Sequence, residues 1–119
     1  MVIKLKRAYE APESDDGFRI LVDRLWPRGV SRSAARIDLW LKEIGPSTEL
    51  RKWFDHDPSK WDTFRVRYLR ELKSRPATVA QLMAHVGNGT VTLVYGTKDH
   101  MHNNAIALKE FIESRRIRV

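Results

Sequence analysis

The chain of 119 residues contains no cysteine, and its 22 Lys and Arg against 15 Asp and Glu give a formal net charge of +7. This length suits one domain spanning residues 1–119, with a core of its own. The lack of cysteine excludes disulfides, thiolate zinc sites and cysteine nucleophiles. No apolar run approaches the roughly 20 residues of a membrane helix, and the N-terminus lacks a signal-peptide core, so we expect a cytoplasmic protein without a membrane partner.

The first half of the chain favours strands. Residues 2–6 alternate loosely between apolar and basic side chains, which indicates a first strand. Residues 18–23 form a second, and their apolar run Ile20-Leu21-Val22 is typical of a strand buried on both faces in a parallel sheet. Pro27 ends this strand, because proline cannot donate to a ladder. Residues 30–45 fit either a strand or a helical turn.

The second half favours helices around one strand. Ser47 is a plausible N-cap, and Asp57-Pro58 places an N-cap before a proline at the first helical position. Apolar residues at helical spacing predict helices starting near residues 48, 58 and 76, the second of them ending near Ser74. Residues 90–95 are β-branched, apolar and bounded by glycine, as in a strand, and a last helix follows over about 103–115.

Helices between strands predict an α/β domain of three layers, with a small, mostly parallel sheet flanked by helices. Ligands of such sheets bind beyond the carboxyl ends of the strands. This rule selects two loops, 24–32 after the second strand and 96–104 after the last strand. A ligand pocket is therefore expected between them.

The first loop contains Arg24, Trp26, Arg28 and Gly29. Arginine forks match carboxylates and phosphates, an indole can stack on a ring, and glycine allows backbone N–H groups to approach an anion. We therefore name these four residues as candidate ligand-binding residues. The alternative is structural: Trp26 would be a core residue, Arg24 would pair with a carboxylate such as Asp23, and Gly29 would only permit a turn.

The second loop leads into the last helix. Tyr95 and Asn103 flank it, and both are candidate ligand contacts together with Lys98, which could hold an anion. His102 is a candidate general acid or base, with Asp99 to orient it. Alternatively, Asn103 or Asp99 only caps the helix and the histidines are exposed. We expect neither a metal nor another cofactor, because short strings of Asp and His are common by chance.

Positive charge also gathers along the predicted helix after Pro58. Arg67, Arg70 and Lys73 could form a nucleic-acid-binding face, although a charge run of this kind is more often a solvated helix face. Arg65 falls within the apolar arc of this helix and should pair with a carboxylate or face a pocket. His56, between two aspartates, is a further candidate whose place in the pocket stays open.

Four motifs carry a resemblance to a known family. They are FRILVDRLWPRG at residues 18–29, WFDHDP at 53–58, Phe64 to Leu72 of the following helix, and TLVYGTKDHMHN at 92–103. In order and spacing they resemble the YeaO-like family, a branch of the domain-of-unknown-function 488 family of small bacterial proteins. The resemblance implies a three-layer α/β fold with a parallel sheet, and it implies no function. Other branches of the wider family look as if they carry cysteines around the last strand and the following loop, whereas this chain has Tyr95 at the end of that strand, so the resemblance implies no thiol chemistry here.

Two hypotheses follow. The first is a protein that binds, or turns over, a small anionic or phosphorylated ligand between the loops 24–32 and 96–104. The second is a nucleic-acid-binding module that uses Arg67, Arg70 and Lys73. The positive charge is spread along the whole chain rather than gathered in one tail, and this weakens the second hypothesis.

Overall fold

Four parallel strands form the central sheet of the computed structural model, which describes residues 2–117. The strands are β1 (Val2–Arg7), β2 (Phe18–Leu21), β3 (Leu39–Trp40) and β4 (Thr90–Tyr95). Their order in the sheet is β1-β4-β2-β3, so the last strand of the chain lies between the first two. The predicted α/β class is confirmed, and the sheet is parallel throughout.

Strand β4 is the centre of the sheet. It pairs Leu93 with Leu5 on one side and with Ile20 on the other. Val91, Leu93 and Val94 are fully buried. The β-branched residues of this segment suit a strand that is covered on both faces, which explains why the sequence predicted its bounds correctly.

The described residues 2–117 form five α-helices, and the helix predicted to begin at Pro58 instead starts with a 3-10 turn and becomes α-helical at Trp61. They are α1 (Arg32–Ala35), α2 (Thr48–Phe54), α3 (Trp61–Lys73), α4 (Pro76–Val86) and α5 (Asn104–Ile117), and single 3-10 turns lie at Ser14–Asp16, Lys42–Ile44 and Pro58–Lys60. The Ser47 hydroxyl accepts a hydrogen bond from the Leu50 N–H and so caps α2. Pro76 begins α4, where its missing N–H costs nothing. Among residues 2–117, no helix is long and apolar enough to cross a bilayer.

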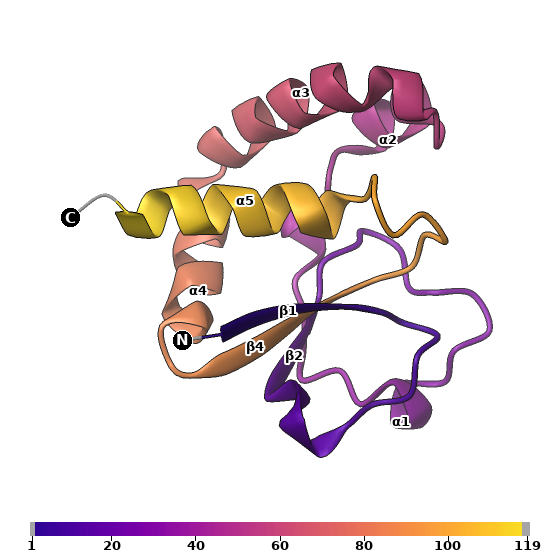
Figure 1. Cartoon of the computed structure of the whole chain (residues 1–119), viewed down its shortest axis with the longest axis vertical. Coiled ribbons are helices and arrows are strands. Elements are labelled where there is room, and N and C mark those ends of the chain that lie inside the picture. The colour runs from indigo at the N-terminus through magenta and orange to yellow at the C-terminus, as the bar shows by residue number, and fades with distance from the viewer. Residues whose placement is uncertain (1, 118–119) are drawn as a thin grey trace.

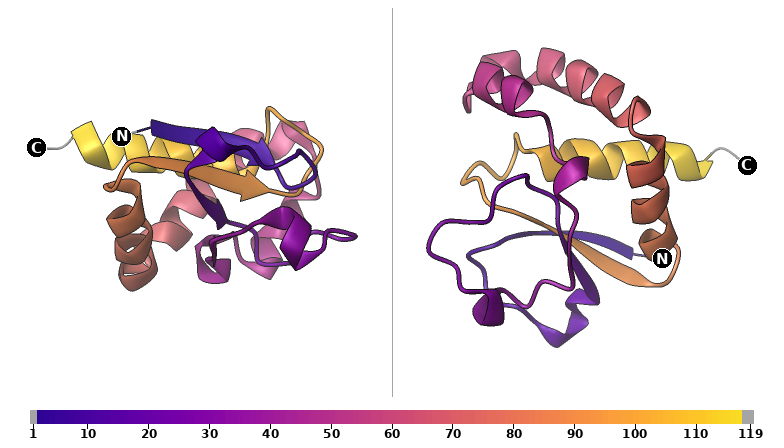
Figure 2. Two further views of the ribbon diagram at one scale, coloured as in Figure 1. Left: turned by 90° about the horizontal axis from the view of Figure 1, so that it is seen from below. Right: turned by 180° about the vertical axis from the view of Figure 1, so that it is seen from behind.

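The two faces of the sheet are covered unequally. Figures 1 and 2 show α3 and α5 on one side of the sheet and the short α1 on the other. The helical side holds the main core, in which Ile20 and Leu93 pack with residues of α3, α4 and α5 such as Leu108. A small second cluster around Leu21 and Val94 lies on the opposite face. The domain thus has the three expected layers, but one of them is thin.

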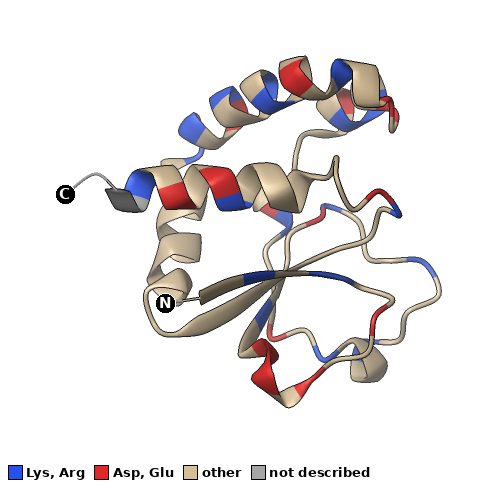
Figure 3. Ribbon diagram, in the orientation of Figure 1, with Lys and Arg blue, Asp and Glu red and all other residues tan. Residues whose placement is uncertain are grey.

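A buried ion cluster supports the thin side. The Arg19 Nη1 donates to Asp16 Oδ2 at 2.6 Å, and the Lys6 Nζ donates to Asp16 Oδ1 at 3.0 Å. Burial alone would raise the pKa of Asp16, but hydrogen bonds from the Glu13 N–H, Lys6 and Arg19 outweigh it and lower this pKa. These charges have partners within the fold, so they contribute structure rather than a ligand site. Figure 3 shows that the remaining basic residues are spread over α3, the strands and the loops.

The segment 30–45, which the sequence left open, contains both kinds of structure. Ser31 caps α1 by accepting a hydrogen bond from the Ala34 N–H. Leu39 and Trp40 then form a strand of two residues that pairs with Ile20 and Leu21. The second predicted strand ends at Leu21 rather than at residue 23, although the Val22 N–H still donates to the Val94 carbonyl. Asp23 follows directly, at the carboxyl edge of the sheet.

Candidate functional site

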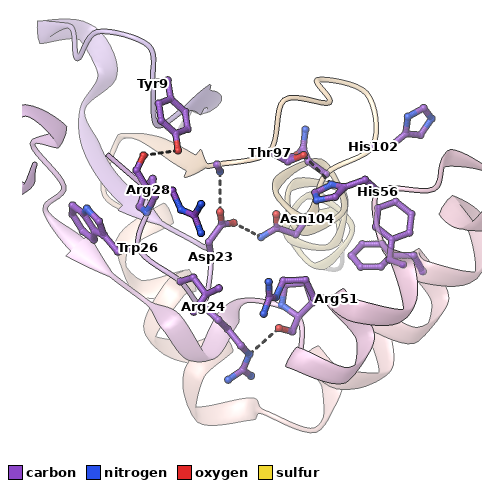
Figure 4. A pocket seen from close by; sticks show the side chains of 17 residues that line it. Tyr9, Asp23, Arg24, Trp26, Arg28, Arg51, His56, Thr97, His102 and Asn104 are labelled. Carbon is purple, nitrogen blue, oxygen red and sulfur yellow. Dashed lines mark hydrogen bonds between the residues drawn. The ribbon is translucent and has the colours of Figure 1, made fainter. Parts of the chain in front are cut away.

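A pocket opens at the carboxyl edge of the sheet, where the sequence placed it. Its volume is about 460 Å³, within the range of small-molecule sites. The loop 23–28, the start of α5 and the region of α2 supply most of its wall (Figure 4). The lining residues are Tyr9, Asp23, Arg24, Leu25, Trp26, Pro27, Arg28, Pro46, Arg51, Phe54, His56, Phe64, Gly96, Thr97, His102, Asn103 and Asn104.

Asp23 ties together three parts of the chain inside this pocket. Its Oδ2 accepts a hydrogen bond from the Gly96 N–H at 2.8 Å, and its Oδ1 accepts one from the Asn104 Nδ2 at 3.0 Å. The same Asn104 amide also donates to the Val22 carbonyl. The ends of β2 and β4 and the first turn of α5 are therefore held in one arrangement around a carboxylate.

The pKa of the Asp23 carboxyl is raised above its ordinary value, and burial is the main cause. Hydrogen bonds from Asn104 and Gly96 and the positive charge of Arg51 act in the opposite direction without cancelling the effect of burial. A half-buried carboxylate with a perturbed pKa in a cleft is a typical feature of a functional site.

Arg28 and Arg51 bring positive charge to the same place. In Figure 4 their side chains extend toward Asp23 from different sides of the pocket. Across the described residues 2–117, neither guanidinium has an ion-pair partner within 4.0 Å. The Tyr9 hydroxyl donates to the Arg28 carbonyl at 2.9 Å, which anchors the backbone of Arg28. Both arginines thus keep donors available for an anion.

Arg24 also lines the pocket, and its side chain is held by backbone carbonyls. Its Nε donates to the carbonyl oxygens of Gly45 and Pro46, at 3.2 and 2.8 Å, and Figure 4 shows its head group turned away from Asp23. A Cβ on Gly45 would lie 3.0 Å from the Arg24 backbone nitrogen, so the two segments are in close contact. The side chain fastens the 45–46 turn to the pocket wall, and its partners are carbonyls rather than the predicted carboxylate.

Trp26 lines the pocket but packs mainly with its own neighbours. Its indole N–H donates to the Val30 carbonyl at 2.6 Å. Its ring packs edge-on against Trp40, with 5.5 Å between the ring centres, and the guanidinium carbon of Arg32 lies 4.6 Å from the centre of the Trp26 ring. Gly29 has a φ of +78° that favours glycine, and it is not among the lining residues. These contacts agree with the structural interpretation of Trp26 and Gly29.

The second loop is ordered by Asp99. Its Oδ1 accepts hydrogen bonds from the N–H groups of Met101 and His102, and its Oδ2 lies 3.0 Å from the His102 Nδ1. Burial would raise the pKa of Asp99, but these bonds outweigh it and lower the pKa. The His102 ring also meets Trp61 edge-on at 5.4 Å. The predicted pairing of His102 with Asp99 is present, and of the two only His102 lines the pocket.

Of the other candidates from this loop, one lines the pocket and two do not. Asn103 is buried, caps α5 by accepting from the Ile106 N–H, and lines the pocket. Tyr95 is buried in the main core, with its hydroxyl 3.2 Å from the His100 Nδ1. Lys98 is exposed, and like Tyr95 it is absent from the pocket wall. The pocket therefore contains only some of the predicted contacts.

His56 belongs to the pocket, and Arg65 does not. The His56 Nδ1 lies 3.3 Å from the Thr97 Oγ1, so the turn after α2 meets the 96–104 loop. Arg65 pairs with Glu110 of α5 and lies 3.8 Å from Asp62, so it has the carboxylate partner that the sequence predicted. Its side chain is 42% exposed, which differs from the predicted burial.

The predicted nucleic-acid face lies elsewhere on the molecule. Arg67, Arg70 and Lys73 are exposed on α3. Arg67 packs 4.2 Å from the centre of the Trp53 ring, and Arg70 lines a shallow second hollow that Glu49 and Glu71 also line. Nucleic-acid binding by these residues stays a prediction.

Comparison with known proteins places the chain in a family. Residues 2–118 match the model described as the inactive DUF488-N3 subclade. The chain belongs to this subclade. It is 42% identical over 114 residues to the uncharacterized protein YeaO of Escherichia coli K12, which covers 96% of this chain and 99% of that protein. It is 37% identical over 113 residues to the uncharacterized protein Rv3073c of Mycobacterium tuberculosis H37Rv, covering 95% of each chain. No solved structure is significantly similar.

Sequence reasoning missed several polar residues in the pocket of this DUF488-N3 protein, among them Asp23, Arg51 and Asn104. Asp23 had been considered only as a partner for Arg24, and Arg51 and Asn104 had no role. A signal was present for Asp23, because a carboxylate directly after a buried strand lies at the ligand-binding edge of a parallel sheet. Arg51 carries no such signal, since only the packing of α2 brings it to the pocket.

Proposed function

We propose that this DUF488-N3 protein binds a small ligand through a phosphate or carboxylate group held between Arg28 and Arg51. The observation that carries the proposal is that two exposed arginines, without ion-pair partners in the described chain, line one pocket and extend toward the same carboxylate. Arginine forks bind such groups in two-pronged hydrogen bonds.

The rest of the wall suits the non-ionic part of a ligand. Phe54 and Phe64 are buried and line the pocket beside Pro46. The cavity of about 460 Å³ has room for a molecule well above the size of inorganic phosphate. His56 and His102 line the same pocket and can add hydrogen bonds to the ligand.

We favour binding over turnover. The subclade is described as inactive, which supports a protein that retains a pocket without chemistry. If the ligand were turned over, His102 oriented by Asp99 would be the proton-transfer group, because the Asp99 contact at Nδ1 leaves Nε2 for a substrate. Binding alone requires only the arginines and the pocket wall.

The test is a thermal-shift and calorimetric titration of the whole chain with inorganic phosphate and with citrate. We expect Arg28→Ala and Arg51→Ala each to weaken binding about 10-fold or more, the effect of losing one charge-assisted hydrogen bond. Arg70→Ala is the matched control, because it removes the same charge from α3 outside the pocket. Equal weakening in all three variants would show nonspecific charge effects and overturn the proposal.

The same proteins separate the pocket from the predicted nucleic-acid face. Binding of a single-stranded oligonucleotide that falls steeply with salt and is lost in the triple Arg67→Ala, Arg70→Ala, Lys73→Ala variant would support the alternative function. If the pocket binds the anion, this triple variant should bind phosphate with the same affinity as the unchanged protein, because none of the three residues lines the pocket.

A further inference from the structure

The carboxylate of Asp23 sets a further condition on the ligand, beyond the negative charge that Arg28 and Arg51 would bind. An ionised carboxylate only accepts hydrogen bonds, and its two oxygens offer about four acceptor positions. In Asp23 one bond from Gly96 and one from Asn104 use two of them. The other acceptor positions stay available to a ligand, because Asp23 lines the cavity. In Figure 4 its carboxylate lies between Arg28 and Arg51.

A ligand that offers only negative charge fits this arrangement poorly. Its oxyanion would bind Arg28 and Arg51 but would approach the carboxylate of Asp23, and like charges repel strongly where water is partly excluded. A ligand with a hydroxyl or ammonium group beside its oxyanion avoids this cost, because that group donates to Asp23 while the oxyanion binds the arginines.

We infer that the natural ligand is a hydroxylated or aminated acid, in which a phosphate or carboxylate lies within a few bonds of a hydrogen-bond donor that Asp23 accepts. This inference rests on the proposed function and specifies its ligand. Polyol and sugar phosphates, hydroxy acids and amino acids share this chemistry. Asp23 is suited to select among anions, because its bonds to Gly96 and Asn104 fix the carboxylate before a ligand arrives.

Two matched pairs of probes test this inference by calorimetry at neutral pH. Glycerol 3-phosphate and propyl phosphate differ only in hydroxyl groups, and so do lactate and propionate. We expect the hydroxylated member to bind about 10-fold more tightly in at least one pair, the effect of a hydrogen bond to a charged acceptor. The pair that shows the preference also identifies the oxyanion as phosphate or carboxylate.

The Asp23→Asn variant tests which residue is responsible. An amide accepts less strongly and carries no charge, so the preference for the hydroxylated probe should fall to about threefold while propyl phosphate binds as well or better. A merely structural loss would instead weaken both probes together. Asp15→Asn is the control, because Asp15 carries the same charge on an exposed turn outside the pocket wall, with a side chain 75% exposed.

The results distinguish anion binding in the pocket from the selection of hydroxylated anions by Asp23. If both members of each pair bind equally and Arg51→Ala weakens both, the anion pocket stands and the role of Asp23 is overturned. If no probe binds the unchanged protein, the proposed function itself fails. The comparison of probes on the unchanged protein needs no variant, so a poorly folded Asp23→Asn chain would not prevent the test.

Discussion

The carboxylate of Asp23 accepts the backbone N–H of Gly96 at 2.8 Å, although the two residues are 73 positions apart in the chain. This bond and the one from Asn104 hold the carboxyl ends of β2 and β4 beside the start of α5. The same residue therefore faces the pocket and supports the edge of the sheet. Changes at this position should be visible in stability as well as in binding.

Replacing Asp23 by Ala should lower the free energy of unfolding by about 2–3 kcal/mol, since two hydrogen bonds to a charged acceptor are lost and the Gly96 N–H is left without its partner. Urea denaturation measures this change. Asp15→Ala, at an exposed carboxylate, should stay within about 0.5 kcal/mol of the unchanged protein. Similar losses in the two variants would contradict the supporting role of Asp23.

The raised pKa of Asp23 predicts a particular dependence of stability on pH. Burial makes the folded protein hold this proton more tightly than the unfolded chain, in which an aspartate has a pKa of about 3.9. Stability from this group is therefore full below about pH 3.9 and is lost as the pH rises through the folded pKa. Asp23→Asn should gain stability relative to the unchanged protein over that rise.

Urea midpoints of both proteins at a series of pH values from about 4 to 7 measure this difference. The pKa values of Asp16 and Asp99 are lowered instead, and both groups are present in both proteins. Their loss of stability on acidification therefore cancels in the comparison. Parallel curves for the two proteins would show that burial of Asp23 does not perturb its titration.

Two glycines of similar φ should respond very differently to alanine. Gly17 has a φ of +67°, and a Cβ there would lie 2.2 Å from the Thr90 carbonyl oxygen. Gly29 has a φ of +78° with nothing within 4 Å of an added Cβ. Gly17→Ala should therefore cost more than about 3 kcal/mol of stability, and Gly29→Ala only about 1 kcal/mol. Thermal melting compares the two, and equal costs would refute the close approach of β4 to Gly17.

The ion pair of Arg19 with Asp16 should contribute much more to stability than the ion pair of Arg65 with Glu110. Arg19→Met leaves the buried Asp16 with less compensation, and we expect a loss of about 3–5 kcal/mol. Arg65→Met breaks a pair with Glu110 whose side chains are 42% and 46% exposed, and the loss should stay below about 1 kcal/mol. Chemical denaturation of both variants tests this, and a reversed order would be inconsistent with the buried cluster.

Local signals predicted most of the fold. Ser47 and Pro76 mark the starts of α2 and α4, Pro58 marks the 3-10 turn that leads into α3, and the β-branched residues 90–95 mark the central strand. The strand at Leu39 and Trp40 could not be predicted, because two residues carry no periodicity and pair only where β2 offers an edge.

The pocket was predicted in place but only partly in content. Topology put Arg28 and His102 at one edge of the sheet, and both line the pocket. The role of Arg51 depends on how α2 packs, and the orientation of Arg24 depends on the carbonyls of Gly45 and Pro46, neither of which a local pattern contains. Lys98 follows the right strand but is exposed, since strand order does not set the direction of a loop side chain.

The order of the strands has a consequence for synthesis. Strands β1 and β2 are not paired with each other, because β4 lies between them and is the last of the four described strands to be synthesised. A nascent chain that ends before residue 90 therefore has no paired β1, and its apolar strand β2 lacks β4 and can pair only with the two-residue strand β3. The central part of the sheet therefore cannot assemble from the first 89 residues alone, and its formation depends on contacts that are distant in the sequence.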